Sequence, residues 1–177
     1  MMKRPERSES ADYYFTYIDK VPDGDIRGIL EAQAVDVPAL LESIPEAQSD
    51  YRYAADKWSI RETVAHLNDC ERLFVFRAFW FARGFSGPLP SFDQNVAMTA
   101  AAAEQRSWSA HIDEFRAVRA ATLALFRNLP AHAWDQRGIA SDNPVTVRAL
   151  AYITAGHVAH HVMLLNERYL SQVSRGR

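Results

Sequence analysis

Residues 145–170 read VTVRALAYITAGHVAHHVMLLNERYL, and this stretch predicts the architecture of the whole chain. It is mostly apolar, it lacks proline, and it carries three of the six histidines. On a helix that advances about 100° per residue, one face gathers Leu150, Ile153, His157, His161 and Leu164. We therefore predict a long buried helix with two imidazoles one turn apart inside an apolar stripe.

The spacing of these two histidines also suggests a chemistry. His157 and His161 are four residues apart, which is how one helix presents two nitrogens to a single metal ion. The neighbouring His160 lies about 60° to one side of His157 on the same helical wheel. Because a metal held inside a helical bundle must lie near the apolar face, we expect His161, and not His160, to pair with His157.

Further segments of the chain show the same helical spacing of apolar residues: 24–43, 60–83 and 108–128. Asp23 is the expected cap of the first, and Ser107 of the third. The second segment, 60–83, has the clearest helix start, because Ser59 and Glu62 form a capping-box pattern. Gly84 marks the end of this helix. No segment shows the alternation typical of strands, so we predict an all-α fold, a four-helix bundle.

The longest connection in this bundle is expected between the second and third helices. Residues 84–95, GFSGPLPSFDQN, are the densest Gly, Pro and Ser stretch of the chain and predict a loop. A loop of this length permits helices that are not consecutive to be neighbours, and we expect it to form the mouth of a site. The expected organisation is a disordered or frayed N-terminus over residues 1–10, one bundle domain over 11–170 that begins with a short aromatic segment, and a polar tail over 171–177.

Composition narrows the class of protein. The chain has 177 residues, of which 48% are apolar and 24% charged, which fits a single globular domain. Its net charge of −2 argues against a nucleic-acid-binding surface. The single cysteine, Cys70, excludes an intrachain disulfide and suits a reducing compartment. No signal peptide or membrane-spanning run is evident, so we expect a cytoplasmic protein that contacts neither nucleic acid nor membrane.

A third histidine on an apolar face completes a candidate metal site. His66 of the second helix, together with His157 and His161, would present three neutral nitrogens from facing helices. This donor set suits Zn²⁺, Ni²⁺ or Fe²⁺ better than Mg²⁺ or Ca²⁺, and three protein ligands leave a position open for water or substrate. The chain has neither HExxH nor Glu-x-x-His, so a zincin or ferritin-like site is not expected.

Several residues near this triad have both a structural and a functional interpretation. Cys70 is most often a small buried residue, with a soft metal ligand as the alternative. Arg77 on an apolar face more often reaches solvent or pairs with a carboxylate than binds substrate. Asp69, three residues after His66, is a candidate for orienting an imidazole or acting as a base. We expect His111 and His132 to be ordinary surface residues.

The sequence resembles the DinB-like family, also called the DinB/YfiT-like metalloenzymes. The specific matches are KWSI at residues 57–60 followed by His66, and the closing HxxxH of His157 and His161, within a resemblance that spans residues 13–170. The resemblance implies a DinB/YfiT-like four-helix bundle, often a homodimer, that holds one divalent metal through His66, His157 and His161. Aromatic residues Phe76 and Phe79 on the second helix also favour a homodimer.

The resemblance says less about the reaction. Family members of known activity transfer thiols such as bacillithiol, act with mycothiol or isomerise maleylpyruvate, and many members have no assigned activity. It implies a metal site more firmly than a reaction. One hypothesis is a metal-dependent enzyme acting on a small molecule, with a low-molecular-weight thiol as candidate partner and thiol transfer or hydrolysis as candidate reactions. The alternatives are a non-enzymatic stress-response protein with a structural or sensory metal, and a bundle whose histidines bind no metal. A pocket that reaches the metal from residues 84–95 would favour the enzyme.

Overall fold

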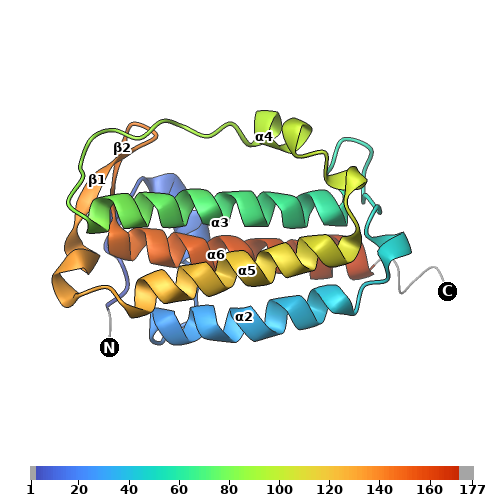
Figure 1. The fold of residues 1–177 in the computed structure, drawn as a ribbon, viewed down its shortest axis with the longest axis horizontal. Coiled ribbons are helices and arrows are strands. Elements are labelled where there is room, and N and C mark those ends of the chain that lie inside the picture. Colours follow the sequence, from blue (N-terminus) through green and yellow to red (C-terminus); the bar gives the residue numbers. More distant parts are fainter. Residues whose placement is uncertain (1–2, 172–177) are drawn as a thin grey trace.

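Four long helices dominate the computed structural model, which describes residues 3–171 (Figure 1). They are α2 (Ile26–Glu42), α3 (Ile60–Ala82), α5 (Trp108–Arg127) and α6 (Val147–Leu164). A π-helical segment, Leu165–Leu170, continues α6. The predicted four-helix bundle is therefore confirmed, and each helix lies within a few residues of its expected range. Within the described residues, no helix is long and apolar enough to cross a membrane.

The order of the helices in space differs from their order in the chain. Both α3 and α2 pack against α5 and α6, so the consecutive helices α2 and α3 lie on a diagonal of the bundle. Figure 1 shows α3 and α5 running in the same direction, with α2 and α6 opposite to them. Parallel neighbours need a connection as long as a helix, and residues 83–107 run back along the bundle with the short helix α4 (Gln94–Ala101). The long predicted loop serves this purpose.

The helix starts follow local capping chemistry. The Ser59 side chain accepts a hydrogen bond from the Glu62 amide (3.2 Å), and the Glu62 carboxylate accepts one from the Ser59 amide (2.6 Å). This is the predicted capping box of α3. The predicted cap of α2 is wrong by two residues: Asp25 caps the helix, because Gly24, with φ of 148°, turns the chain just before it.

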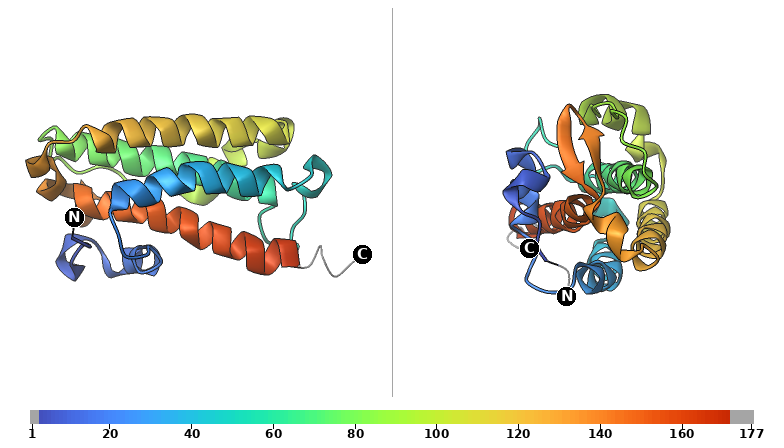
Figure 2. Two further views of the ribbon diagram at one scale, coloured as in Figure 1. Left: turned by 90° about the horizontal axis from the view of Figure 1, so that it is seen from below. Right: turned by 90° about the vertical axis from the view of Figure 1, so that its left-hand side faces the viewer.

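The N-terminal segment packs along α6, on the side away from α5 (Figure 2). Its short helix α1 (Phe15–Ile18) comes so close that a Cβ atom added at Gly156 would lie 2.1 Å from the Tyr17 carbonyl oxygen. Only glycine permits this approach of the two backbones. Gly156 thereby fixes the position of the segment next to His157.

Residues 3–10, part of the N-terminus expected to be disordered or frayed, contact the bundle. Glu9 is buried and accepts hydrogen bonds from Arg148 Nη2 (2.8 Å), Arg148 Nε (3.0 Å) and Thr146 Oγ1 (2.7 Å). Arg4 donates to the carbonyl oxygens of Ile18 (2.7 Å) and Val21 (2.6 Å). The polar sequence of residues 3–10 does not reveal these long-range contacts. The predicted tail, residues 171–177, lies outside the described residues apart from Ser171.

A small β-hairpin was not expected. Strands β1 (Arg137–Ala140) and β2 (Asn143–Thr146) pair in antiparallel register through a two-residue turn, Ser141 and Asp142, both with positive φ. The loop before α4 joins this hairpin, because the Leu89 amide donates to the Ile139 carbonyl (2.9 Å) and the Leu89 carbonyl accepts from the Ser141 amide (3.1 Å). The hairpin and the loop form one wall of the cavity described next.

Candidate metal centre

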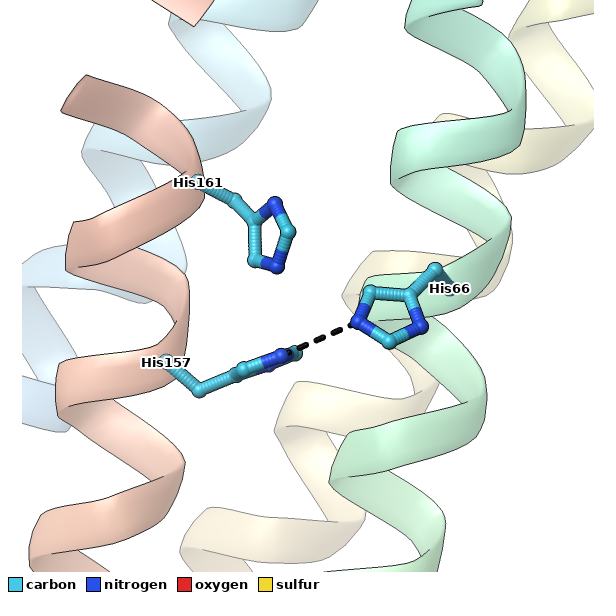
Figure 3. A group of neighbouring side chains, drawn as sticks. All are labelled: His66, His157 and His161. Atoms are coloured by element: carbon cyan, nitrogen blue, oxygen red, sulfur yellow. Dashed lines mark hydrogen bonds between the residues drawn. The ribbon is translucent and has the colours of Figure 1, made fainter. Parts of the chain in front are cut away.

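Three histidines converge between α3 and α6 (Figure 3). His66 projects from the second turn of α3, and His157 and His161 project from successive turns of α6. The Nε2 atoms of His66 and His157 are 3.1 Å apart, and one ring nitrogen from each of the three lies within 4.8 Å of the others. Chain segments that are far apart in sequence thus bring the predicted triad together.

His160, the neighbour of His161, does not join this group. Its ring lies beside those of His161 and Tyr17, with centroid distances of 5.1 and 5.4 Å. The Nδ1 atom of His160 is buried without a hydrogen-bond partner among the described residues. The helical wheel had placed His161, and not His160, on the apolar face, and the structure has the same arrangement.

Burial keeps the three imidazoles uncharged. It lowers the pKa of His66 to about 4 and that of His161 to about 3, and it lowers the pKa of His157 well below its usual value. At neutral pH each ring therefore has an unprotonated nitrogen. No carboxylate or thiol of the described residues belongs to this cluster. Three neutral nitrogen donors are a ligand set suited to Zn²⁺, Ni²⁺ or Fe²⁺.

The spacing of the nitrogens also fits one ion. With metal–nitrogen bonds of about 2.0–2.1 Å, two nitrogens of a tetrahedral site lie roughly 3.4 Å apart. The His66 and His157 nitrogens, at 3.1 Å, are already near that separation. The His161 nitrogen lies within 4.8 Å of both, so the three nitrogens are close enough together to share one ion.

Aromatic rings surround the imidazoles and explain their low pKa values. The Trp58 ring lies 4.7 Å from that of His66, and the rings of Tyr17 and Phe74 lie 5.1 and 5.6 Å from that of His157. Such walls exclude water and penalise the charged form of each ring. Sequence patterns had assigned neither Tyr17 nor Trp58 to the site. The signals in the sequence were the short aromatic segment at the start of the bundle domain, which carries Tyr17, and the KWSI match, which carries Trp58.

Cys70 lies against His66, with Sγ 3.6 Å from Nδ1. Burial raises the pKa of the thiol to about 12, so it remains protonated at neutral pH. A thiol binds metal and reacts as the thiolate, which this environment disfavours. The position therefore fits the structural interpretation of Cys70, a small buried residue that supports the His66 ring.

A cavity of about 460 Å³ opens beside the triad. His66 and His157 form part of its wall, and residues 91–94 of the long loop form another part. Arg77 and Ser141 line the end farther from the histidines along α3. The expected mouth near residues 84–95 is thus present. A smaller hollow of about 220 Å³, on the side of Trp58 and Tyr169, reaches His161.

Asp69, a candidate for orienting an imidazole or acting as a base, lies 3.6 Å from Arg72 Nη1, and within residues 3–171 no hydrogen bond joins it to the three imidazoles. The prediction that His111 is a surface residue was wrong. His111 is fully buried, with Nε2 2.9 Å from the Ala103 carbonyl oxygen, because the turn after α4 covers it. His132 is exposed, as expected.

A family model described as the DinB superfamily matches residues 29–165. The chain belongs to the DinB superfamily. The match includes the three histidines, whereas the N-terminal segment that carries Tyr17 lies outside it. No curated protein matches the sequence.

Two solved structures share the fold of this DinB-superfamily chain. One is YfiT from Bacillus subtilis, described as a probable metal-dependent hydrolase with an unusual four-helix bundle topology. It has a TM-score of 0.63 and 18% identity, and the match covers 98% of this chain and 92% of YfiT. The other is a mycothiol-dependent maleylpyruvate isomerase, with a TM-score of 0.65 and 13% identity. That match covers 82% of this chain and 61% of the isomerase. At these identities the likeness concerns the fold.

Proposed function

We propose that this protein is a metal-dependent enzyme in which His66, His157 and His161 hold one divalent transition metal ion, Zn²⁺, Ni²⁺ or Fe²⁺. The observation that carries the proposal is the convergence of three uncharged imidazoles at the wall of a cavity of about 460 Å³. A bound ion would lower the pKa of a water or thiol at its open position, which is the chemistry that it supplies.

The packing of the triad supports a metal over three merely buried histidines. Burying a polar ring away from water costs free energy unless its nitrogens find partners. The nearest polar neighbour of His66 Nε2 is another imidazole nitrogen, that of His157. In such a pair one ring donates and the other accepts, whereas an ion between the rings would engage both lone pairs at once.

The open side of the triad supports catalysis over a structural metal. Structural zinc sites are closed by four protein ligands, often cysteines, whereas catalytic sites keep one position for water or substrate. Here three histidines form the cluster, and Cys70 is held as a neutral thiol. The cavity gives a small molecule access to His66 and His157. A sensory or structural metal in a stress-response protein is the second candidate.

The descriptions of the two similar structures guide the choice of reaction. One is described as a probable metal-dependent hydrolase and the other as mycothiol-dependent. We propose a small-molecule substrate, and either hydrolysis or transfer of a low-molecular-weight thiol. In both reactions the role of the triad is the same, because water and thiol are each activated by loss of a proton.

The test starts with the metal. Protein purified without a histidine tag is analysed for metal, stripped with a chelator, and reloaded with Zn²⁺, Ni²⁺ or Fe²⁺. We expect one ion per chain and a higher melting temperature on reloading, because a ligand that binds the folded state stabilises it. Turnover of ester, amide and thiol-acceptor panels is then compared between loaded and stripped protein. An ion that binds without any metal-dependent turnover would favour the sensory or structural alternative.

We also propose a homodimer. Phe76, Phe79 and Phe85 are 47%, 40% and 52% exposed, and they lie at the C-terminal end of α3 and in the turn that follows it. Exposed aromatic side chains that gather in one place are typical of protein interfaces. Light scattering should give twice the chain mass of 20.0 kDa. A monomer mass at micromolar concentration would contradict this.

A further inference from the structure

Arg77 is a buried arginine that lines the same cavity as His66 and His157. Its side chain belongs to α3, three turns beyond His66, and the residue is 2% exposed. Nη2 donates to the Pro90 carbonyl oxygen (2.8 Å) and to Ser141 Oγ (3.0 Å). Nε is buried without an acceptor, and within residues 3–171 no ion pair joins Arg77 to a carboxylate. Hydrogen bonds thus hold the guanidinium in place, but no carboxylate neutralises its charge.

Other buried arginines of the bundle are neutralised by carboxylates. Arg119, 1% exposed, donates to both carboxylate oxygens of Glu71, at 2.8 and 2.7 Å. Arg61 pairs with Asp50 at 2.9 Å. A buried charge without a partner costs several kcal/mol, and such groups are typical of functional sites. Arg77 differs from Arg119 and Arg61 in this respect, and it is the one that faces the cavity.

The remaining wall of the cavity indicates what would neutralise Arg77. Its lining combines the apolar or aromatic side chains of Leu73, Phe74 and Tyr14 with polar ones such as Ser91 and Gln94. Arg77 is the one positively charged residue among the described residues of the lining, because His66 and His157 are neutral. Asp93, the acidic residue of the lining, is exposed, and its Oδ1 caps α4 by accepting from the Asn95 amide. One guanidinium in a cavity whose wall is partly apolar and aromatic matches a ligand with one negative charge and an apolar body.

We propose that Arg77 binds the carboxylate of an organic-acid substrate whose apolar part extends along the cavity toward the three histidines. The eleven residues that separate Arg77 from His66 span about 16 Å of helix. Side chains of a helix point toward its N-terminus, so the guanidinium lies nearer to His66 than its backbone does. The assignment of the reacting end rests on the proposed function, whereas binding of the carboxylate by Arg77 does not require a metal.

The test uses a matched pair of probes that differ in charge and hardly in shape, 3-phenylpropionate and 3-phenylpropanamide. Dissociation constants are measured by nuclear magnetic resonance titration on the full-length protein, stripped of metal. We expect the acid to bind about 10-fold more tightly than the amide, because a charge-assisted hydrogen bond contributes that much. Arg77→Gln should abolish this preference. Arg127→Gln, which removes an exposed arginine paired with Glu31, is the matched control and should keep it.

Two further variants distinguish carboxylate binding by Arg77 from a purely structural role, in which Arg77 only joins the loop to the hairpin. Ser141→Ala removes one acceptor of Arg77 and keeps the guanidinium, so the preference for the acid should persist. Arg77→Lys keeps the charge and should retain part of the preference, and it replaces Arg77→Gln if that variant fails to fold. The inference is overturned if wild-type protein binds acid and amide equally, or if Arg77→Gln, or Arg77→Lys used in its place, keeps the full preference.

The same titration separates this inference from the metal proposal. If the acid preference depends on Arg77 but no metal binds, the carboxylate site stands and the proposed function fails. If metal binds but the acid and the amide bind alike, the proposed function stands and the carboxylate site fails.

Discussion

Two of the groups of buried polar side chains in this bundle are built in opposite ways. Between α2, α3 and α5, Glu71 accepts from Arg119 Nη2 (2.7 Å) and Thr122 Oγ1 (2.7 Å), and Gln33 accepts from Arg119 Nη1 (2.9 Å). Opposite charges meet there and hydrogen bonds join them. Between α3 and α6, three neutral imidazoles meet beside a cavity.

The difference shows how to tell a structural network from a site. A buried network whose charges and hydrogen bonds are matched internally needs nothing from outside the protein. The imidazole cluster brings one ring nitrogen from each of three neutral side chains within 4.8 Å of the others, has no internal ion pair, and adjoins a cavity. The first group should therefore contribute to stability and the second to binding, and the following experiments test that division.

The largest effect is expected at the triad. His66→Ala, His157→Ala and His161→Ala should each abolish measurable binding of Zn²⁺, because each removes one of three proposed ligands. His160→Ala should leave the metal bound, with an affinity lowered at most about 10–100-fold, as for residues outside the ligand set. Calorimetric titration of stripped protein measures both. A site emptied by His160→Ala and spared by His161→Ala would refute the triad.

The next effect concerns stability and should spare the metal. Glu71→Ala leaves Arg119 as an unpaired buried charge, so the free energy of unfolding should fall by about 3–5 kcal/mol. Glu31→Ala breaks the exposed pair with Arg127 and should cost less than about 1 kcal/mol. Urea denaturation gives both values, and metal stoichiometry of the folded variants should remain that of the wild type. A Glu71→Ala variant as stable as the wild type would remove the contrast between the two groups.

The pH dependence of the metal-free protein is expected to come from the imidazoles. Burial lowers the pKa of His66 from 6.5 to about 4 and that of His161 from 6.5 to about 3. Below about pH 6.5 the unfolded chain therefore binds more protons at these two residues than the folded chain does. Stability should therefore be unaffected by these groups above neutral pH and fall as the pH drops from about 6.5 to about 4. Unfolding at about pH 7.5 and about pH 5 measures this. His66→Gln should reduce the difference, and the exposed His132→Ala should not.

The smallest effect is expected at Cys70. Cys70→Ala removes a small buried side chain and should cost about 1 kcal/mol of stability, while one ion per chain still binds. The reason is that the pKa of the thiol is raised by burial, to about 12, which disfavours the thiolate that metals require. Metal analysis of the reloaded variant measures the outcome. Loss of the ion would show that Cys70 is a ligand after all.

The parts of the molecule that the sequence could predict are those governed by local periodicity. The four helices, the capping box at Ser59 and the orientation of His161 each follow from spacing along a single segment. The contacts of Glu9 depend on partners far away in the chain, whereas the hairpin and the burial of His111 depend on nearby turns that show no regular periodicity. The lack of an ion pair at Arg77 could not be predicted either, because a sequence does not show which carboxylates lie near an arginine in the folded chain.

The parallel arrangement of α3 and α5 has a kinetic consequence. His66 and His157 are 91 residues apart in the chain, and the long connection 83–107 has to be laid along the bundle before α5 can dock between α2 and α3. Contacts of such long sequence separation form late and slow the folding reaction. An ion that needs both helices in place therefore cannot act as a nucleus for folding. It should leave the refolding rate unchanged and lower the unfolding rate. Stopped-flow measurements with and without Zn²⁺ would record both rates.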